Sequence, residues 1–181
     1  MIGAAVSFFV WLEETPLSVW IRESPELWAF PFILYLHTLG LALVAGLSSA
    51  IALSVLALPG QRLRAPLDRL FPLIWIGLAI NVLSGVALLI AYPAKALTNP
   101  VFFIKLTAIA IAVVIVQWLQ RQCLGAPAIA HADGSVTVAA SPAQLKRAAW
   151  ALLALWLIAT VSGRLLAYTY SILLATFPGL A

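Results

Sequence analysis

The chain has 181 residues, of which 64% are hydrophobic and only 9% are charged, whereas an average soluble domain has roughly 25% charged residues. Runs of about 20 nearly uncharged residues match the roughly 30 Å hydrocarbon core of a bilayer, so the sequence predicts an all-α integral membrane protein and excludes a soluble catalytic domain. The net charge of +4 comes from basic residues that flank the apolar runs and set membrane topology, so we exclude nucleic acid as a partner.

Residues 1–30 are predicted to form an interfacial amphipathic segment. The apolar stretch 1–12 is too short to span a membrane and lacks the basic start of a signal peptide. The residues that follow mix tryptophans with charged residues and prolines: Trp11, Trp20, Trp28, Glu13, Glu14, Arg22, Glu23, Glu26, Pro16 and Pro25. This composition is typical of short helices that lie in the headgroup region.

Residues 31–181 are predicted to form a four-transmembrane-helix bundle. The spans are expected at about 31–58, 70–92, 101–119 and 144–174. The longest connection, about 120–144, is rich in Ala, Pro and Gly and is expected to be flexible and solvent-exposed. The single cysteine, Cys123, is interpreted as a free thiol because no metal-binding motif surrounds it.

Basic residues in the connections predict the orientation. Two connections on one side are flanked by six basic residues: Arg62, Arg64, Arg69, Arg121, Lys146 and Arg147. The other side has only Arg22 and Lys95. By the positive-inside rule, the two basic connections are cytoplasmic and both termini lie on the outer, periplasmic side of a bacterial plasma membrane.

Three ionisable residues fall inside the predicted spans: His37, Lys105 and Arg164. Such residues cost several kcal/mol to insert, so each is a functional-site hypothesis. A rise of about 1.5 Å per residue places His37 roughly 9 Å, Lys105 roughly 6 Å and Arg164 roughly 15 Å from the outer ends of their helices. All three fall in the outer half of the membrane, where we expect them to converge.

These groups have no acidic partner within the spans, because all six Asp and Glu residues lie outside them. Haem b would supply two propionates together with an iron that binds imidazole. We therefore expect haem b as a cofactor, with His37 as the axial metal ligand and Lys105 or Arg164 beside the propionates. Gly40, three residues after His37 on nearly the same helix face, would let the flat macrocycle approach the backbone.

Each of these residues also has a purely structural interpretation. His37 alone could be hydrogen-bonded to a neighbouring helix. Lys105 and Arg164 could extend their side chains to the outer headgroups. Interhelical hydrogen bonds are the simplest interpretation of the other polar residues in the spans, Asn81, Ser84, Gln117 and Ser162. His131 lies in a connection on the side opposite His37, and we expect it to be uninvolved.

The chain offers few further iron ligands. Its only methionine is Met1, and His37 is the only histidine in the predicted spans. A bis-His or His/Met haem site therefore cannot be built within one chain. The iron is expected to be five-coordinate, or to bind Lys105 or a residue of another subunit as well. A homo-oligomer or a membrane redox complex would supply such a residue.

Three stretches, ESPELWAFPFILYLHTLGLALVAG, NPVFFIKLTAIAIA and SGRLLAY, together resemble a family of small bacterial four-helix membrane proteins over most of the chain. The segment RLFPLIWIGLAINVLSGVALL followed by FFIKL is distantly similar to the CopD copper-resistance membrane domain. The chain also resembles HemJ-type protoporphyrinogen oxidases, which bind haem b. That resemblance implies haem-associated positions at His37 and Lys105. The tryptophan-rich and Arg-Leu signatures that follow the histidine in HemJ are missing here.

Three functional classes remain open at this stage. The leading hypothesis is a haem-b-binding protein of the b-type cytochrome kind, which transfers electrons in a redox complex or acts on a small substrate near the outer face. A second class is transport of copper or another small solute, although paired His or Met ligands along a path are absent from the sequence. The third class is an accessory subunit without a cofactor, in which small residues such as Ala42, Ala45, Gly46 and Ser49 form a packing surface.

Overall fold

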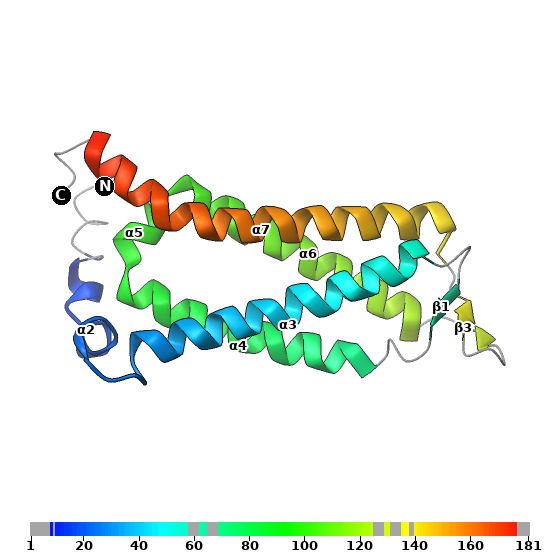
Figure 1. Ribbon diagram of the computed structural model, residues 1–181, viewed down its shortest axis with the longest axis horizontal. Helices are drawn as coiled ribbons and strands as arrows, with labels where there is room; N and C mark the ends of the chain where they lie inside the picture. The colour runs from blue at the N-terminus through cyan, green and yellow to red at the C-terminus, as the bar shows by residue number, and fades with distance from the viewer. Residues whose placement is uncertain are drawn as a thin grey trace.

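Four long helices run side by side along the molecule (Figure 1). The computed structural model describes residues 8, 10–57, 62–64, 69–124, 129–130, 135–137 and 140–176. The long helices are α3 (Phe30–Ala57), α4 (Leu70–Ala91), α6 (Pro100–Leu124) and α7 (Pro142–Thr176). Each is long and apolar enough to cross a membrane. The chain is thus an all-α multi-pass membrane protein, as the sequence predicted.

The ends of the long helices follow local sequence signals. Ser141 and Gln144 form a capping box before α7, with Ser141 N donating to Gln144 Oε1 at 3.0 Å and Gln144 N donating to Ser141 Oγ at 3.3 Å. Pro142 then occupies the first turn, so α7 begins two residues before the predicted position. Pro93 ends α4 and starts the short helix α5 (Pro93–Leu97).

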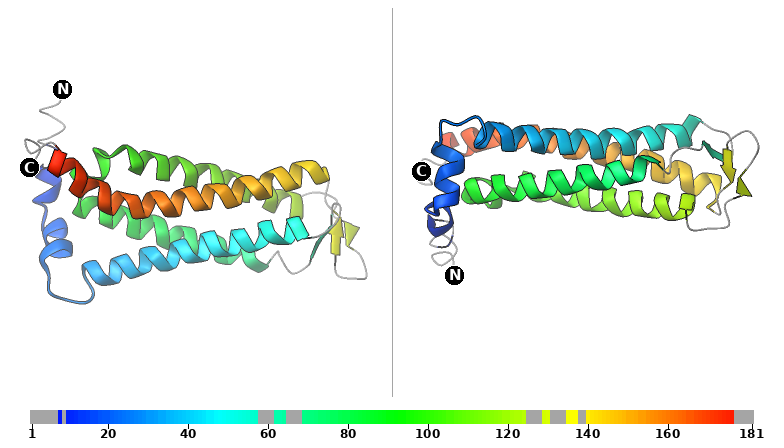
Figure 2. Two further views of the ribbon diagram at one scale, coloured as in Figure 1. Left: turned by 45° about the horizontal axis from the view of Figure 1, so that its top comes forward. Right: turned by 90° about the horizontal axis from the view of Figure 1, so that it is seen from below.

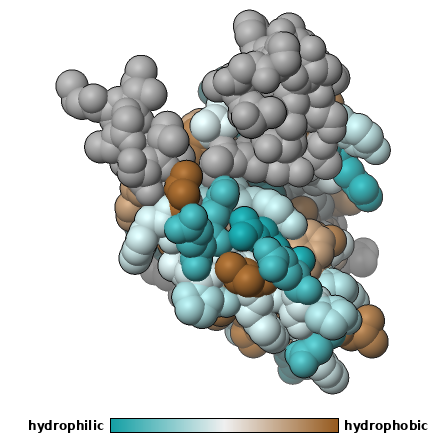
Figure 3. Space-filling model, turned by 90° about the vertical axis from the view of Figure 1, so that its left-hand side faces the viewer, coloured by the Kyte–Doolittle hydropathy of each residue, from teal (hydrophilic) through white to brown (hydrophobic). Residues whose placement is uncertain are grey.

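The N-terminal region lies across one end of the bundle (Figure 2). Its helix α2 (Pro16–Glu23) is capped by Thr15, whose side chain accepts a hydrogen bond from Ser18 N. Arg22 Nη2 donates to Glu13 O at 2.9 Å. Hydrophilic and hydrophobic residues share the surface of this end (Figure 3), which is the pattern expected at a membrane interface. Residues 1–7, at the start of the predicted surface segment, lie outside the described residues.

The opposite end carries a small sheet that the sequence did not predict. Strands β1 (Arg62–Arg64), β2 (Ile129–Ala130) and β3 (Ser135–Thr137) pair antiparallel in the order β1-β3-β2. The predicted flexible connection at 120–144 therefore contains the end of α6, two strands and the start of α7. His131 and Asp133, which lie between the strands, are outside the described residues. The two ends are called the α2 end and the sheet end below.

The long helices form a ring with one loose side. Helix α3 packs along α4, α6 packs along α7, and α3 packs against α7 (Figures 1 and 2). The backbones of α4 and α6, both described over their full length, make few close approaches to each other. The order around the ring is therefore α4, α3, α7 and α6, with a loosely packed boundary between α6 and α4.

The tightest crossing in the ring joins α3 and α4 at two glycines. A Cβ at Gly40 would lie 2.6 Å from Asn81 N and 2.8 Å from Gly77 O. A Cβ at Gly77 would lie 2.6 Å from Leu43 Cβ. Small residues let membrane helices approach in this way, which favours van der Waals packing where no hydrophobic effect acts between helices. This crossing positions the polar groups of α4 beside α3.

Candidate functional site

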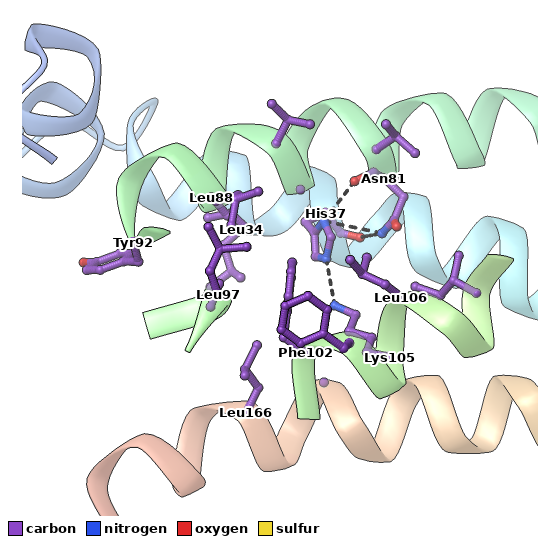
Figure 4. A pocket seen from close by; sticks show the side chains of 18 of the residues that line it. Leu34, His37, Asn81, Leu88, Tyr92, Leu97, Phe102, Lys105, Leu106 and Leu166 are labelled. Carbon is purple, nitrogen blue, oxygen red and sulfur yellow. Dashed lines mark hydrogen bonds between the residues drawn. The ribbon is translucent and has the colours of Figure 1, made fainter. Parts of the chain in front are cut away.

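A cavity of about 720 Å³ lies within the half of the ring nearer the α2 end. Side chains from α3, α4, α5, α6 and α7 line it, and most of them are aliphatic or aromatic. His37, Asn81, Tyr92 and Lys105 are its polar lining residues, and Lys105 provides an amine. We call this space the His37 cavity; Figure 4 shows it from close by. Its size and apolar walls are those of a typical small-molecule or cofactor site.

The imidazole of His37 is held by α4. Its Nδ1 lies 3.1 Å from Asn81 O and 3.3 Å from Ser84 Oγ. Because a backbone carbonyl can only accept, Nδ1 carries the proton and donates it to Asn81 O. Asn81 also donates from Nδ2 to His37 O at 2.8 Å, so the two helices are joined twice at this level. The hydrogen bond to the carbonyl fixes both the tautomer and the direction of the ring.

The other imidazole nitrogen, Nε2, faces Lys105 on α6. Lys105 Nζ lies 3.4 Å from His37 Nε2, and the contact crosses the cavity between diagonally opposite helices (Figure 4). With the proton on Nδ1, Nε2 has a lone pair and accepts from the lysine. The structure therefore brings together two of the residues that the sequence singled out. The cavity contains an acceptor nitrogen next to a multiple hydrogen-bond donor.

Two glycines make room for this pair, and the sequence analysis missed both. A Cβ at Gly85 on α4 would lie 3.2 Å from His37 Cε1. A Cβ at Gly163 on α7 would lie 3.7 Å from Lys105 Nζ. Gly85 stands four residues after Asn81, on the same helix face, and this spacing is the signal that could have identified it. Larger side chains at these positions would enter the space around the imidazole and the amine.

The other two sequence-predicted site residues are not in the His37 cavity. Gly40 is buried against α4, where its missing side chain serves the helix crossing, so it does not offer a face to a macrocycle in the cavity. Arg164 is exposed on α7 and does not line the cavity, although its neighbour Gly163 does. The predicted depth of Arg164 was compatible with a shared site, but its side chain is on another face of the helix.

The remaining polar residues of the spans differ in their roles. Asn81 and Ser84 are buried and make the interhelical hydrogen bonds that the sequence predicted. Gln117 is exposed, and its neighbour Gln120 instead accepts a hydrogen bond from Trp75 Nε1 at 2.8 Å. This bond links α6 to α4 towards the sheet end. Ser162 is buried in α7.

The metal-binding capacity of the site rests on one imidazole. Within the part of the chain that the structure describes, no three His, Cys, Asp or Glu side chains lie close enough to hold a metal ion. A metal whose equatorial ligands come from a macrocycle needs only an axial ligand from the protein. His37 can provide such a ligand through Nε2.

Comparisons of the chain with family models, with curated proteins and with solved structures found no match. The fold defines the class: a multi-pass membrane protein with four spanning helices, which here enclose an apolar cavity that contains a histidine and a lysine. The resemblances inferred from short stretches of sequence therefore remain expectations.

Proposed function

We propose that this chain is a haem-b-binding protein of the bacterial plasma membrane in which His37 is the axial ligand of the iron. The proposal rests on the tautomer and the orientation of the His37 imidazole. Nδ1 is held by Asn81 O at 3.1 Å, so the lone pair of Nε2 is directed into an apolar cavity of about 720 Å³. Histidines that bind metals almost always donate their other ring N–H to such a partner.

The lining of the cavity fits haem b in polarity. Aliphatic and aromatic side chains provide walls for an apolar macrocycle, and Lys105 provides an amine that would be protonated beside a propionate. A charged hydrogen bond from this amine would hold a propionate in a site without other cations. Bound haem would supply one-electron redox chemistry, which is the role we propose for the protein.

Lys105 has to change partner when His37 binds iron. In the structure its amine is 3.4 Å from Nε2, the same nitrogen that would coordinate the metal. Coordination uses the lone pair that now accepts from Lys105, so the amine is released for a propionate or for the sixth coordination position. Arg164, which is exposed, is assigned no contact with the cofactor.

The position of the cavity supports redox chemistry near the outer face. Six of the ten basic residues of the chain lie in the connections at the sheet end or in the helix ends that adjoin them, so we propose that this end is cytoplasmic. The His37 cavity then lies in the outer half of the membrane, below an interfacial α2. Both termini would be periplasmic.

An absorbance spectrum tests the proposal. The detergent-purified full chain should show a Soret band that shifts on reduction with dithionite, either as isolated or after addition of haemin. His37→Ala should lose this band. His131→Ala, which changes the other histidine of the chain, is the matched control and should retain it.

Each result that contradicts haem binding by His37 would favour a different interpretation of the site. A colourless wild-type protein that binds no haemin contradicts the proposal and favours an accessory subunit, in which the His37–Lys105 hydrogen bond is only structural. Copper that copurifies with the wild-type protein but not with His37→Ala would indicate copper handling. An unchanged Soret band in His37→Ala would remove the histidine from the site.

A further inference from the structure

We infer that the ligand of the His37 cavity enters sideways, from the hydrocarbon of the membrane, between α4 and α6. This inference takes the identity of the ligand, haem b, from the proposed function, but the route itself follows from the packing of the helices. Of the four neighbouring pairs in the ring, α3–α4, α6–α7 and α3–α7 pack against each other, whereas α4 and α6 make few close approaches. We call this boundary the seam.

The seam is open in only one half of the molecule. Towards the sheet end, Trp75 Nε1 donates to Gln120 Oε1 at 2.8 Å and ties α4 to α6. Phe71 and Leu119, from the same two helices, belong to the buried hydrophobic cluster of that half. Towards the α2 end the two helices instead border the His37 cavity. The gap between them therefore coincides in depth with the site.

The edges of the open half of the seam are apolar. Val82 and Val86 on α4 and Phe103 and Leu106 on α6 all line the cavity, and each is about half exposed. These side chains cannot hydrogen-bond to water, and their helices are among those that cross the membrane. Acyl chains of the surrounding lipid would therefore contact the entrance directly, which favours passage of a membrane-dissolved molecule.

The route from the aqueous side is covered. Helix α5 contributes Ala96 and Leu97 to the end of the cavity nearest α2. Phe30 and Tyr92 close the same end with an edge-on ring contact, their centroids 6.0 Å apart. In Figure 4, Tyr92 and Leu97 lie on the side of the cavity that is nearer the N-terminal helices. A ligand from water would have to displace these groups, whereas one from the lipid meets only the edges of the seam.

The chemistry of the cavity defines what can use this entrance. A ligand must have an apolar part that packs against the cavity walls, and an anionic or acceptor group to which Lys105 can donate a hydrogen bond. An anionic phospholipid also combines apolar chains with an anionic group, so the experiments must distinguish entry of the cofactor from entry of a lipid. Haem dissolved in a membrane satisfies both requirements through its macrocycle and its propionates.

The first test measures haem transfer. Apo protein in lipid vesicles is mixed with haem-loaded vesicles, and the rise of the Soret band is followed. Val86→Trp should slow the transfer about tenfold, because an overpacked entrance raises the barrier and about 1.36 kcal/mol corresponds to tenfold in rate. Phe103→Ala should accelerate it. Each rate is taken from a time course normalised to the variant's own final absorbance, because Val86 and Phe103 also line the cavity.

Ile76→Trp is the matched control for the slow variant. Ile76 is on the same helix and is 53% exposed, compared with 49% for Val86, but it does not line the cavity. Its transfer rate should equal that of the wild type. Equal rates in Val86→Trp and Ile76→Trp, or a rate that Phe103→Ala leaves unchanged, would overturn lateral entry.

The second test does not require haem. Apo protein is reconstituted with a phospholipid that has a photoactivatable diazirine near the end of one acyl chain, and the labelled residues are mapped by mass spectrometry. We expect label on Lys105 in the wild type and much less in Val86→Trp. Label confined to residues outside the cavity would contradict the route. If the wild type binds no haem but labels Lys105, the proposed function fails while lateral access from the lipid stands.

Discussion

Replacing Gly40 by alanine separates a packing role from a ligand-binding role for this residue. The added Cβ would lie 2.6 Å from Asn81 N and 2.8 Å from Gly77 O, both backbone atoms that cannot rotate away. Heavy atoms pack at about 3.5–4.0 Å, so α3 and α4 must separate locally by about 1 Å. Overpacking of this kind costs about 1–3 kcal/mol.

The separation also affects the polar contact next to the crossing. Asn81 Nδ2 donates to His37 O at 2.8 Å, and a further 1 Å or so would exceed hydrogen-bonding distance. An interhelical hydrogen bond in a membrane protein contributes about 0.6–1.7 kcal/mol. The unfolding free energy of Gly40→Ala should therefore fall by about 1.6–4.7 kcal/mol.

Reversible unfolding in mixed detergent micelles, followed by far-ultraviolet circular dichroism, measures this change. Gly46→Ala on the same helix is the matched control, because a Cβ at Gly46 meets no heavy atom within 4 Å. It should be as stable as the wild type, or more stable, since alanine is the better helix former. Equal stability of the two variants would refute the tight crossing that positions His37 beside α4.

Three further predictions concern polar contacts between the helices and in the cavity. Trp75→Phe removes the hydrogen bond to Gln120 and should lower the unfolding free energy by about 0.6–1.7 kcal/mol in the same assay. Gln120→Leu should then cost less in the Trp75→Phe background than in the wild type, because the hydrogen bond that it breaks is already absent. Asn81→Ala removes the hydrogen bond to His37 O but keeps the backbone carbonyl that holds the imidazole. It should therefore lower the unfolding free energy by about 0.6–1.7 kcal/mol, while haemin titration shows an affinity close to that of the wild type. Lys105→Met should weaken haemin binding by about 10–100-fold, since a hydrogen bond to a charged group contributes about 1.5–3 kcal/mol, and Lys105→Arg should restore most of it; full affinity in Lys105→Met would contradict the contact with a propionate.

The sequence predicted the four spans well because length and apolarity alone determine which segments cross a membrane. The predicted first span, about 31–58, compares with Phe30–Ala57 in α3, and the second, about 70–92, with Leu70–Ala91 in α4. The third was predicted too short, since α6 continues through the polar helix formers that precede Leu124. The apolar stretch of the sequence ends at the membrane edge, whereas the helix continues beyond it.

The residues that line the His37 cavity could be predicted only in part. Counting residues along each helix gives the depth of a side chain, and for His37 and Lys105 the depth was enough to suggest that they meet. It does not give the direction of the side chain, and Arg164, placed at a compatible depth, is exposed on another face. Membrane helices are apolar on all sides, so no periodicity in the sequence distinguishes the inward face from the lipid-facing one.

Gly40 and Gly85 illustrate the same limit. Both stand inside apolar spans near a polar residue, and either could have adjoined a ligand. The structure buries Gly40 at a helix crossing and sets Gly85 beside the His37 ring. Only the pairing of the helices decides between these roles, and that pairing depends on close packing of small residues rather than on hydropathy.

Chemical rescue tests the central claim, axial ligation by His37, most directly. His37→Gly removes the imidazole and leaves space at the end of the cavity lined by Asn81 and Lys105. We predict that this variant, mixed with haemin, shows no Soret band like that of the wild type, and that added imidazole restores it in a saturable manner. A wild-type Soret band in His37→Gly without imidazole, or a spectrum that imidazole leaves unchanged, would contradict the account.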